Sequence, residues 1–281
     1  MNYRLALTPP IGPRSDEADN RGHVFQSATT NSAAPQRPRL LLLEADAELG
    51  ALLDADSFSR ARTALTAAWA PLNTGPWQVG RLRHASPANA GLLLLSGVIA
   101  REVVLAGDVS SELLGAGDLI RPWSTQADTA LLDAEVRWNV LAAGRVALLD
   151  APFMARAAAY PGVAAMLMER IEARSRRLAT LKAIAQLTRV DERLVAVIRH
   201  FCERWGRVTA DGVVLPLCLS HRMLGELVGA RRPSVSTAAA ALERSGRLIR
   251  RPDGTWLVRD HDTAPRTAPE SVAQRRRLLA A

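Results

Sequence analysis

The stretch Leu219–Leu248 constrains the fold most, because two short helical patterns meet there at a single glycine. Ser220 is a good N-cap for a first helix, and Gly229 supplies the tight turn after it, since a positive φ is easiest for glycine. A second helix opens with Pro233 in its first turn and closes at Gly246, which is the asymmetry expected of helix ends. The apolar residues share one face of each helix: Leu224, Leu227 and Val228, then Val235, Ala238, Ala239 and Leu242. This order of elements predicts a helix-turn-helix.

The other face of the second helix is basic and hydroxylated at its start. Arginine can bond guanine O6 and N7 together, hydroxyls can bond phosphates or base edges, and a helix N-terminus favours a phosphate. Arg247–Val258 then suit a two-stranded wing with a turn at Pro252–Gly254. The pattern predicts a winged helix-turn-helix over residues 189–260 that binds double-stranded DNA. The candidate contacts are Ser220, His221, Arg231, Arg232, Ser234, Ser236, Thr237 and Arg250.

The distribution of charge favours a polyanionic partner for this region. The chain has a net charge of +8; residues 189–260 hold 13 Lys/Arg against 8 Asp/Glu, whereas residues 40–150 hold 8 against 13. A helical hairpin with arginines on its solvent side is the simpler alternative, but it leaves the basic helix start and the following wing unexplained. A helix-turn-helix that contacts protein instead of DNA stays open.

Residues 40–152 show a different pattern, of short apolar runs separated by turn residues. Leu49–Ala70 suits one or two short helices that end at Pro71. The runs that follow predict short strands: Gly91–Gly97, Val98–Leu105, Val109–Leu114, Val136–Val140 and Arg145–Leu149. Such strands with frequent glycine turns favour an antiparallel β-roll. The predicted fold class is α+β, and we expect residues 1–39 and 261–281 to be disordered tails, the second one basic.

A helix is predicted over residues 153–188, between the roll and the helix-turn-helix. Five of its positions alternate at four- and three-residue spacing, as in the seam of a two-stranded coiled coil: Leu167, Ile171, Arg174, Leu178 and Leu181. Charged neighbours leave only a narrow stripe, so we interpret it as the interface of a homodimer. The alternative is one face of a helix that packs on its own domain.

From about residue 40 onward the chain resembles the Crp/Fnr superfamily of bacterial transcription regulators. Ser220–Leu248 resembles the family's helix-turn-helix, Leu95–Ile99 and Gly115–Leu119 resemble its cyclic-nucleotide-binding β-roll, and the heptad helix resembles its dimerisation helix. The resemblance implies a homodimer that reads a roughly palindromic site in the major groove, with half-sites about one helical turn apart. RNA polymerase is a candidate further partner of such a regulator.

Two departures from the family pattern affect specificity. Arg232 matches the family's first base-reading Arg, but Pro233 and Thr237 stand where an acidic residue and a second Arg are common. The roll lacks the Gly-Glu pair that binds a ribose, and Arg137 is not followed by Ser or Thr, so a phosphodiester would lose charge-assisted hydrogen bonds. We therefore expect no cofactor, and a cyclic nucleotide is disfavoured. The candidate pocket residues for another, unidentified effector are Trp123, Arg137 and Trp138.

Other classes of function lack their signals. The sequence has no P-loop, dinucleotide glycine fingerprint, nucleophile elbow or metal-binding pair, so we expect no enzyme. Cys202 and Cys218 cannot form a cluster, and the five histidines show no ligand spacing, so no metal is expected. No apolar run can cross a membrane and no secretory signal is evident, which predicts a cytoplasmic protein. A ligand-gated regulator, a constitutive one, and a ligand-binding or protein-interaction module without DNA binding stay open.

Overall fold

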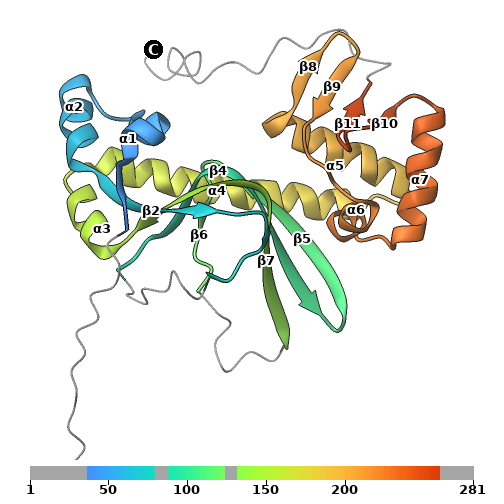
Figure 1. Cartoon of the computed structure of the whole chain (residues 1–281), viewed down its shortest axis with the longest axis horizontal. Coiled ribbons are helices and arrows are strands. Elements are labelled where there is room, and N and C mark those ends of the chain that lie inside the picture. The colour runs from blue at the N-terminus through green and yellow to red at the C-terminus, as the bar shows by residue number, and fades with distance from the viewer. Residues whose placement is uncertain (1–36, 80–87, 124–131, 260–281) are drawn as a thin grey trace, which may run out of the picture. The chain divides into compact units, whose positions relative to one another are not determined.

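The fold has three parts, which correspond to the three hydrophobic patterns of the sequence: a strand-rich region, a long helix and a C-terminal domain (Figure 1). The computed structural model describes residues 37–79, 88–123 and 132–259. The predicted tails lie outside these ranges, apart from residues 37–39, and Arg39 already begins the first strand. Within the described ranges, no helix combines the length and apolar character needed to span a bilayer.

The strand-rich region is an antiparallel sheet dominated by two long strands, β4 (Gly91–Leu105) and β7 (Ala134–Leu149), which pair with each other (Figure 1). The strand order is β1-β2-β7-β4-β5, with β3 beside β7 and β6 beside β4. The shorter strands are β1 (Arg39–Leu41), β2 (Thr66–Leu72), β3 (Gly75–Pro76), β5 (Asp108–Gly115) and β6 (Leu119–Ile120). The predicted roll is therefore present, but the runs predicted as four separate strands join in pairs to form β4 and β7.

The join within β4 is a bulged bend. The pairing register with β7 shifts between Leu94 and Val98, and again before Ile99. Gly97 has a φ of 89°, and a Cβ there would lie 2.6 Å from the Ala142 carbonyl oxygen across the sheet. Glycine is thus required by both conformation and space, as is typical where a strand bends sharply.

The prediction of helix as far as Pro71 is wrong in its second half. The elements here are α1 (Leu42–Ala45), a 3₁₀ turn η1 (Ala47–Gly50), α2 (Ala55–Ala64) and then β2. Pro71 lies inside β2, opposite Arg145 of β7. Ala67 packs into one apolar cluster and Ala68 into a second one on the opposite face. A strand buried on both faces lacks the alternation of apolar and polar residues, so the sequence cannot distinguish it from a buried helix.

The helix predicted over 153–188 is two helices, α3 (Ala151–Ala157) and α4 (Pro161–Ala185). The break is caused by Pro161, which disfavours helical conformation at the residue before it and lacks an N–H. Tyr160 accordingly has φ −129° and ψ 74°. Pro161 then stands in the first turn of α4, where a missing N–H does no harm.

The C-terminal domain combines three helices with a small sheet. Its helices are α5 (Val190–Trp205), α6 (His221–Val228) and α7 (Arg232–Arg244). Its strands are β8 (Arg207–Thr209), β9 (Gly212–Leu215), β10 (Leu248–Arg250) and β11 (Trp256–Val258), in the order β10-β11-β9-β8. The predicted winged helix-turn-helix is confirmed, and β8 and β9 extend its predicted two-stranded wing to four strands.

The described elements from residue 37 onward form one compact unit, and the C-terminal domain packs against one face of the roll. Val98 and Ala100 of β4 and Leu113 of β5 belong to the same buried cluster as residues of α5, α6 and α7. Ile99 and Leu114, their neighbours in sequence, point to the other side of the sheet and into a cluster within the roll. The sheet therefore separates two apolar cores.

Candidate nucleic-acid interface

The turn between α6 and α7 is fixed by local hydrogen bonds. Ser220 Oγ accepts from Met223 N at 3.2 Å, and α6 ends at Gly229 with φ 63° and ψ 45°. Ala230 N then donates to Gly225 O at 2.9 Å. A Cβ on Gly225 would lie 2.4 Å from Ala230 O, so α6 needs a glycine there as well as at its end. The sequence analysis missed Gly225, although a glycine inside a short amphipathic helix is itself a signal of close backbone approach.

The first turn of α7 presents its cations to solvent. Val235, Ala239 and Leu242 are buried and hold the helix on the domain. Arg231, Arg232 and Ser234 are exposed at the N-terminal end, and Pro233 removes an N–H that the helix does not use. These three side chains are therefore accessible to a ligand at the N-terminal end of α7 without a rearrangement of the helix.

Four predicted contacts are engaged within the chain: Ser220 as the N-cap described above, and Thr237, Ser236 and His221 as follows. Thr237 Oγ1 donates to Pro233 O at 3.2 Å, one turn earlier in α7. Ser236 Oγ lies 3.0 Å from His221 Nδ1 and so links α7 to the start of α6. Burial first, and then the Arg250 and Arg232 guanidiniums, lower the pKa of His221 below its ordinary value. The imidazole is thus neutral near pH 7 and joins the two helices.

The wing borders a groove beside α7. Trp256 of β11 is buried, and its Nε1 donates to Leu219 O at 3.2 Å, which anchors the wing to the start of the helix-turn-helix. The Arg250 guanidinium lies 5.9 Å from the centre of the Trp256 ring system. The groove, of about 580 Å³, is lined by residues of α6, α7 and the wing that include His221, Ser236, Glu243, Arg250, Arg251 and Trp256. The wing thus brings two further cations to the face on which α7 presents Ser236.

The predicted seam on α4 is only partly available to a second molecule. Leu167 is buried in the chain's own core, Arg174 pairs with Glu112 of β5, and Leu181 packs against the C-terminal domain's cluster. Leu167 is thus buried within its own chain, whereas Arg174 and Leu181 are engaged there but stay partly exposed, so the dimer contacts at these positions remain predictions. Ile171 and Leu178 are exposed, as is Met168, at 65%. An exposed stripe with the same alternating spacing keeps Ile171 and Leu178 and replaces the other three seam residues by their next neighbours, Met168, Ser175 and Lys182.

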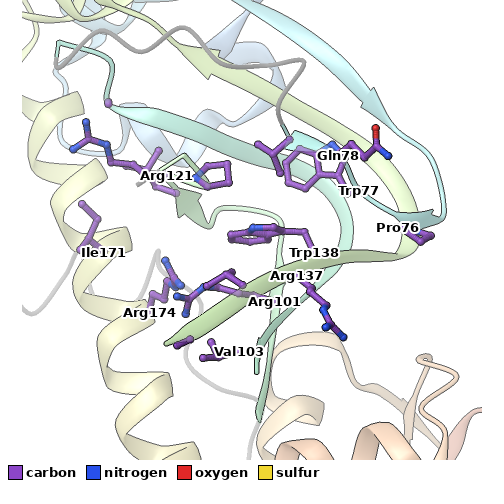
Figure 2. Close-up of a pocket in the computed structure, with 16 residues that line it drawn as sticks. Pro76, Trp77, Gln78, Arg101, Val103, Arg121, Arg137, Trp138, Ile171 and Arg174 are labelled. Carbon is purple, nitrogen blue, oxygen red and sulfur yellow. The ribbon is translucent and has the colours of Figure 1, made fainter. Parts of the chain in front are cut away.

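A cavity of about 1010 Å³ lies between the roll and α4 (Figure 2). Two of the three predicted pocket residues line it, Arg137 and Trp138, whereas Trp123 packs against the roll's inner cluster. The Trp77 and Trp138 rings meet edge to face at 6.1 Å. Arg137 pairs with Glu135 at 2.6 Å and points away from the other arginines in Figure 2, so its role as a ligand contact remains a prediction.

The cavity takes its charge from arginines that the sequence analysis did not single out. Arg101 of β4, Arg121 after β6 and Arg174 of α4 line it together. Arg174 donates two hydrogen bonds of 2.8 Å to the buried Glu112, and Arg101 lies 3.7 Å from the same carboxylate. Among the described lining residues, none carries a hydroxyl and none is acidic. The wall therefore suits an anion with a planar apolar part better than the ribose of a nucleotide.

No family model matches the chain, and no curated protein matches it. Solved structures do match, at low identity. A cyclic-nucleotide-binding-domain-containing protein from Listeria monocytogenes superposes with a TM-score of 0.57 and 15% identity, over 76% of this chain and 96% of that one. FixK2 from Bradyrhizobium japonicum gives 0.52 and 16%, over 71% and 98%.

A third match is a transcriptional regulator of the CRP family from Thermus thermophilus, TTHB099. Its TM-score is 0.52 and its identity 14%, over 68% of this chain and 92% of that one. The predicted resemblance is thereby confirmed at the level of structure: the chain has the Crp/Fnr fold, with an antiparallel roll, a long helix and a C-terminal winged helix-turn-helix.

Proposed function

We propose that this protein is a transcription regulator of the Crp/Fnr type, a homodimer that reads double-stranded DNA in the major groove through α7. The observation that carries the proposal is the first turn of α7, where Arg231, Arg232 and Ser234 stand exposed on a helix that is otherwise fixed by buried residues. A rigid helix with cations at its N-terminal end is what base reading requires.

The contacts divide into two chemical classes. Arg232, one residue before Pro233 in the first turn, is suited to bond guanine O6 and N7, and Ser234 to bond a base edge or a phosphate. Arg250 and Arg251 on the wing, together with His221 beside the N-cap of α6, are suited to phosphates. Ser236 Oγ lies beside His221 Nδ1 and links α7 to α6, while Thr237 Oγ1 donates within α7. Both side chains, and Ser220 at the N-cap, remain candidate DNA contacts.

The dimer proposal rests on the exposed stripe of α4. Met168, Ile171 and Leu178 are large apolar side chains that remain accessible, and Ser175 separates them with a small residue. Two copies of such a stripe, packed in parallel, bury the apolar surface that a single chain leaves in water. A two-fold axis along α4 then presents two α7 helices to successive turns of DNA.

The cavity supports a second element of the proposal, an effector site for a small organic anion. Three guanidiniums and two tryptophan rings favour an anion with a planar group, and the absence of hydroxyls from the described lining disfavours a cyclic nucleotide. We expect no resident cofactor, no catalytic activity, a cytoplasmic location and RNA polymerase as a candidate partner.

Selection of bound DNA from a random duplex pool, without ligand, tests the proposal. We expect enrichment of a two-fold symmetric motif by the wild-type protein, and loss of preference at one base position per half-site for Arg232→Ala. Arg62→Ala is the matched control, because Arg62 lies on α2 in an exposed pair with Glu44. DNA affinity should fall steeply with added salt, as phosphate contacts require. No affinity for any duplex would favour the alternative of a protein-interaction module.

A further inference from the structure

Strand β5 presents different residues on its two faces. Side chains alternate along a strand, so Ser111, Leu113 and Gly115 share one face while Glu112 and Leu114 share the other. The first three all contact the C-terminal domain. Glu112 instead turns toward α4 and the arginines of the cavity, and Leu114 enters the inner cluster of the roll. One strand thus contacts the C-terminal domain with one face and, through Glu112 on the other face, binds Arg174 of α4.

The contacts of the first face reach both α5 and α6. Ser111 Oγ donates to Glu226 Oε2 of α6 at 3.0 Å, although the two residues are 115 apart in the sequence. Leu113 is buried in the cluster that it shares with α5 and α6. A Cβ on Gly115 would lie 2.9 Å from the Trp205 ring at the end of α5, so the glycine allows the indole to pack directly on the strand.

The turn after β5 adds an ion-pair centre that joins all three parts of the fold. Asp118 is 1% exposed, and it accepts from Gly115 N at 2.8 Å, from Arg204 of α5 at 2.8 Å and from Arg177 of α4. Arg204 also donates to Ala116 O at 2.7 Å. Because a buried carboxylate is costly without its partners, separating α5 from the roll would leave Asp118 with fewer cations in a dry environment.

From these contacts we propose that β5 and the turn ending at Asp118 form a clamp that fixes the C-terminal domain relative to α4. The inference rests on the proposed function, because in a dimer built on α4 the clamp then sets the separation of the two recognition helices. Glu112 ties the same strand to Arg174, which lines the cavity.

Two small substitutions test the clamp from the side of the C-terminal domain. Ser111→Ala removes the hydrogen bond to Glu226, and Gly115→Ala inserts one methyl group against Trp205, at a residue without a positive φ. Ser110→Ala is the matched control, because Ser110 is the exposed neighbour on β5. Each full-length protein is measured for hydrogen exchange in α5 and α6, and for affinity toward duplexes with one or two copies of the selected half-site.

The clamp predicts faster exchange in α5 and α6 for Ser111→Ala and Gly115→Ala, and wild-type exchange for Ser110→Ala. Affinity for one half-site should stay within about twofold of wild type, while affinity for the two-half-site duplex should fall by about tenfold, as loss of a hydrogen bond to a charged group would allow. Unchanged exchange, or an equal loss on both duplexes, would overturn the clamp. If the wild-type protein binds neither duplex, the proposed function fails, and the exchange measurement still decides the clamp.

Discussion

Replacing Asp118 by Asn isolates the energetic contribution of the buried ion-pair centre. The amide keeps the shape of the side chain and still accepts from Gly115 N, but it removes the charge that Arg177 and Arg204 share. Breaking a buried ion pair costs about 3–5 kcal/mol when both partners are dry. The two arginine side chains are 29% and 20% exposed, so water screens part of that loss.

We therefore expect Asp118→Asn to lower the free energy of unfolding by about 2–3 kcal/mol, or the melting temperature by about 5–10 °C. The assay is denaturant or thermal unfolding followed by circular dichroism. Arg62→Ala is the control: its pair with Glu44 has the same 2.8 Å separation but lies at the surface, with side chains 56% and 46% exposed. Its melting temperature should match the wild type. Equal losses for the two variants would refute the argument that burial makes the Asp118 pairs matter.

The remaining predictions concern the interface, the dimer and pH. Arg232→Ala should weaken binding to the selected site by about 1–3 kcal/mol in fluorescence anisotropy, and equal weakening on unrelated DNA would make Arg232 a phosphate contact. Leu178→Asp should be monomeric in light scattering, because it places a charge in the interface. Val208→Asp is the control and should stay dimeric, since Val208 of β8 is 87% exposed. A dimeric Leu178→Asp protein would show that α4 is not the interface. Burial lowers the pKa of His221 in the folded protein below its ordinary value of 6.5. As the pH drops below 6.5, the imidazole is therefore protonated more readily in the unfolded chain than in the folded one, and the free energy of unfolding decreases. His221→Gln should reduce this pH dependence in denaturant titrations, and an unaltered dependence would assign it to other groups.

The sequence predicted the helix-turn-helix closely because its signals are local. A capping serine, a glycine at positive φ and a first-turn proline each fix the backbone within a few residues, and Ser220, Gly229 and Pro233 occupy those places in the structure. The long helix is a contrasting case. A heptad pattern predicts an apolar stripe on a helix, but it does not predict which surface packs against that stripe. In α4, Leu167 and Arg174 contact the chain's own roll.

The Glu112–Arg174 pair beside the cavity and the contacts of the clamp were out of reach of sequence reasoning for a different reason. Glu112 and Arg174 are 62 residues apart, Asp118 and Arg204 are 86 apart, and Ser111 and Glu226 are 115 apart. No periodicity or capping rule relates positions at such separations; only the closing of the sheet brings them together. Arg137 and Trp138, which the sequence analysis proposed for the pocket, do line the cavity, but the pairing of Arg137 with Glu135 could not be predicted.

Hydroxyl-radical footprinting on the selected duplex tests the central claim most directly. The account predicts two protected patches of equal strength, centred about 10 base pairs apart and related by a two-fold axis. Both should weaken for Arg232→Ala at the lowest protein concentration that saturates the wild-type footprint. A single patch, or equal protection by the two proteins at that concentration, would contradict a dimer that reads DNA through the first turn of α7.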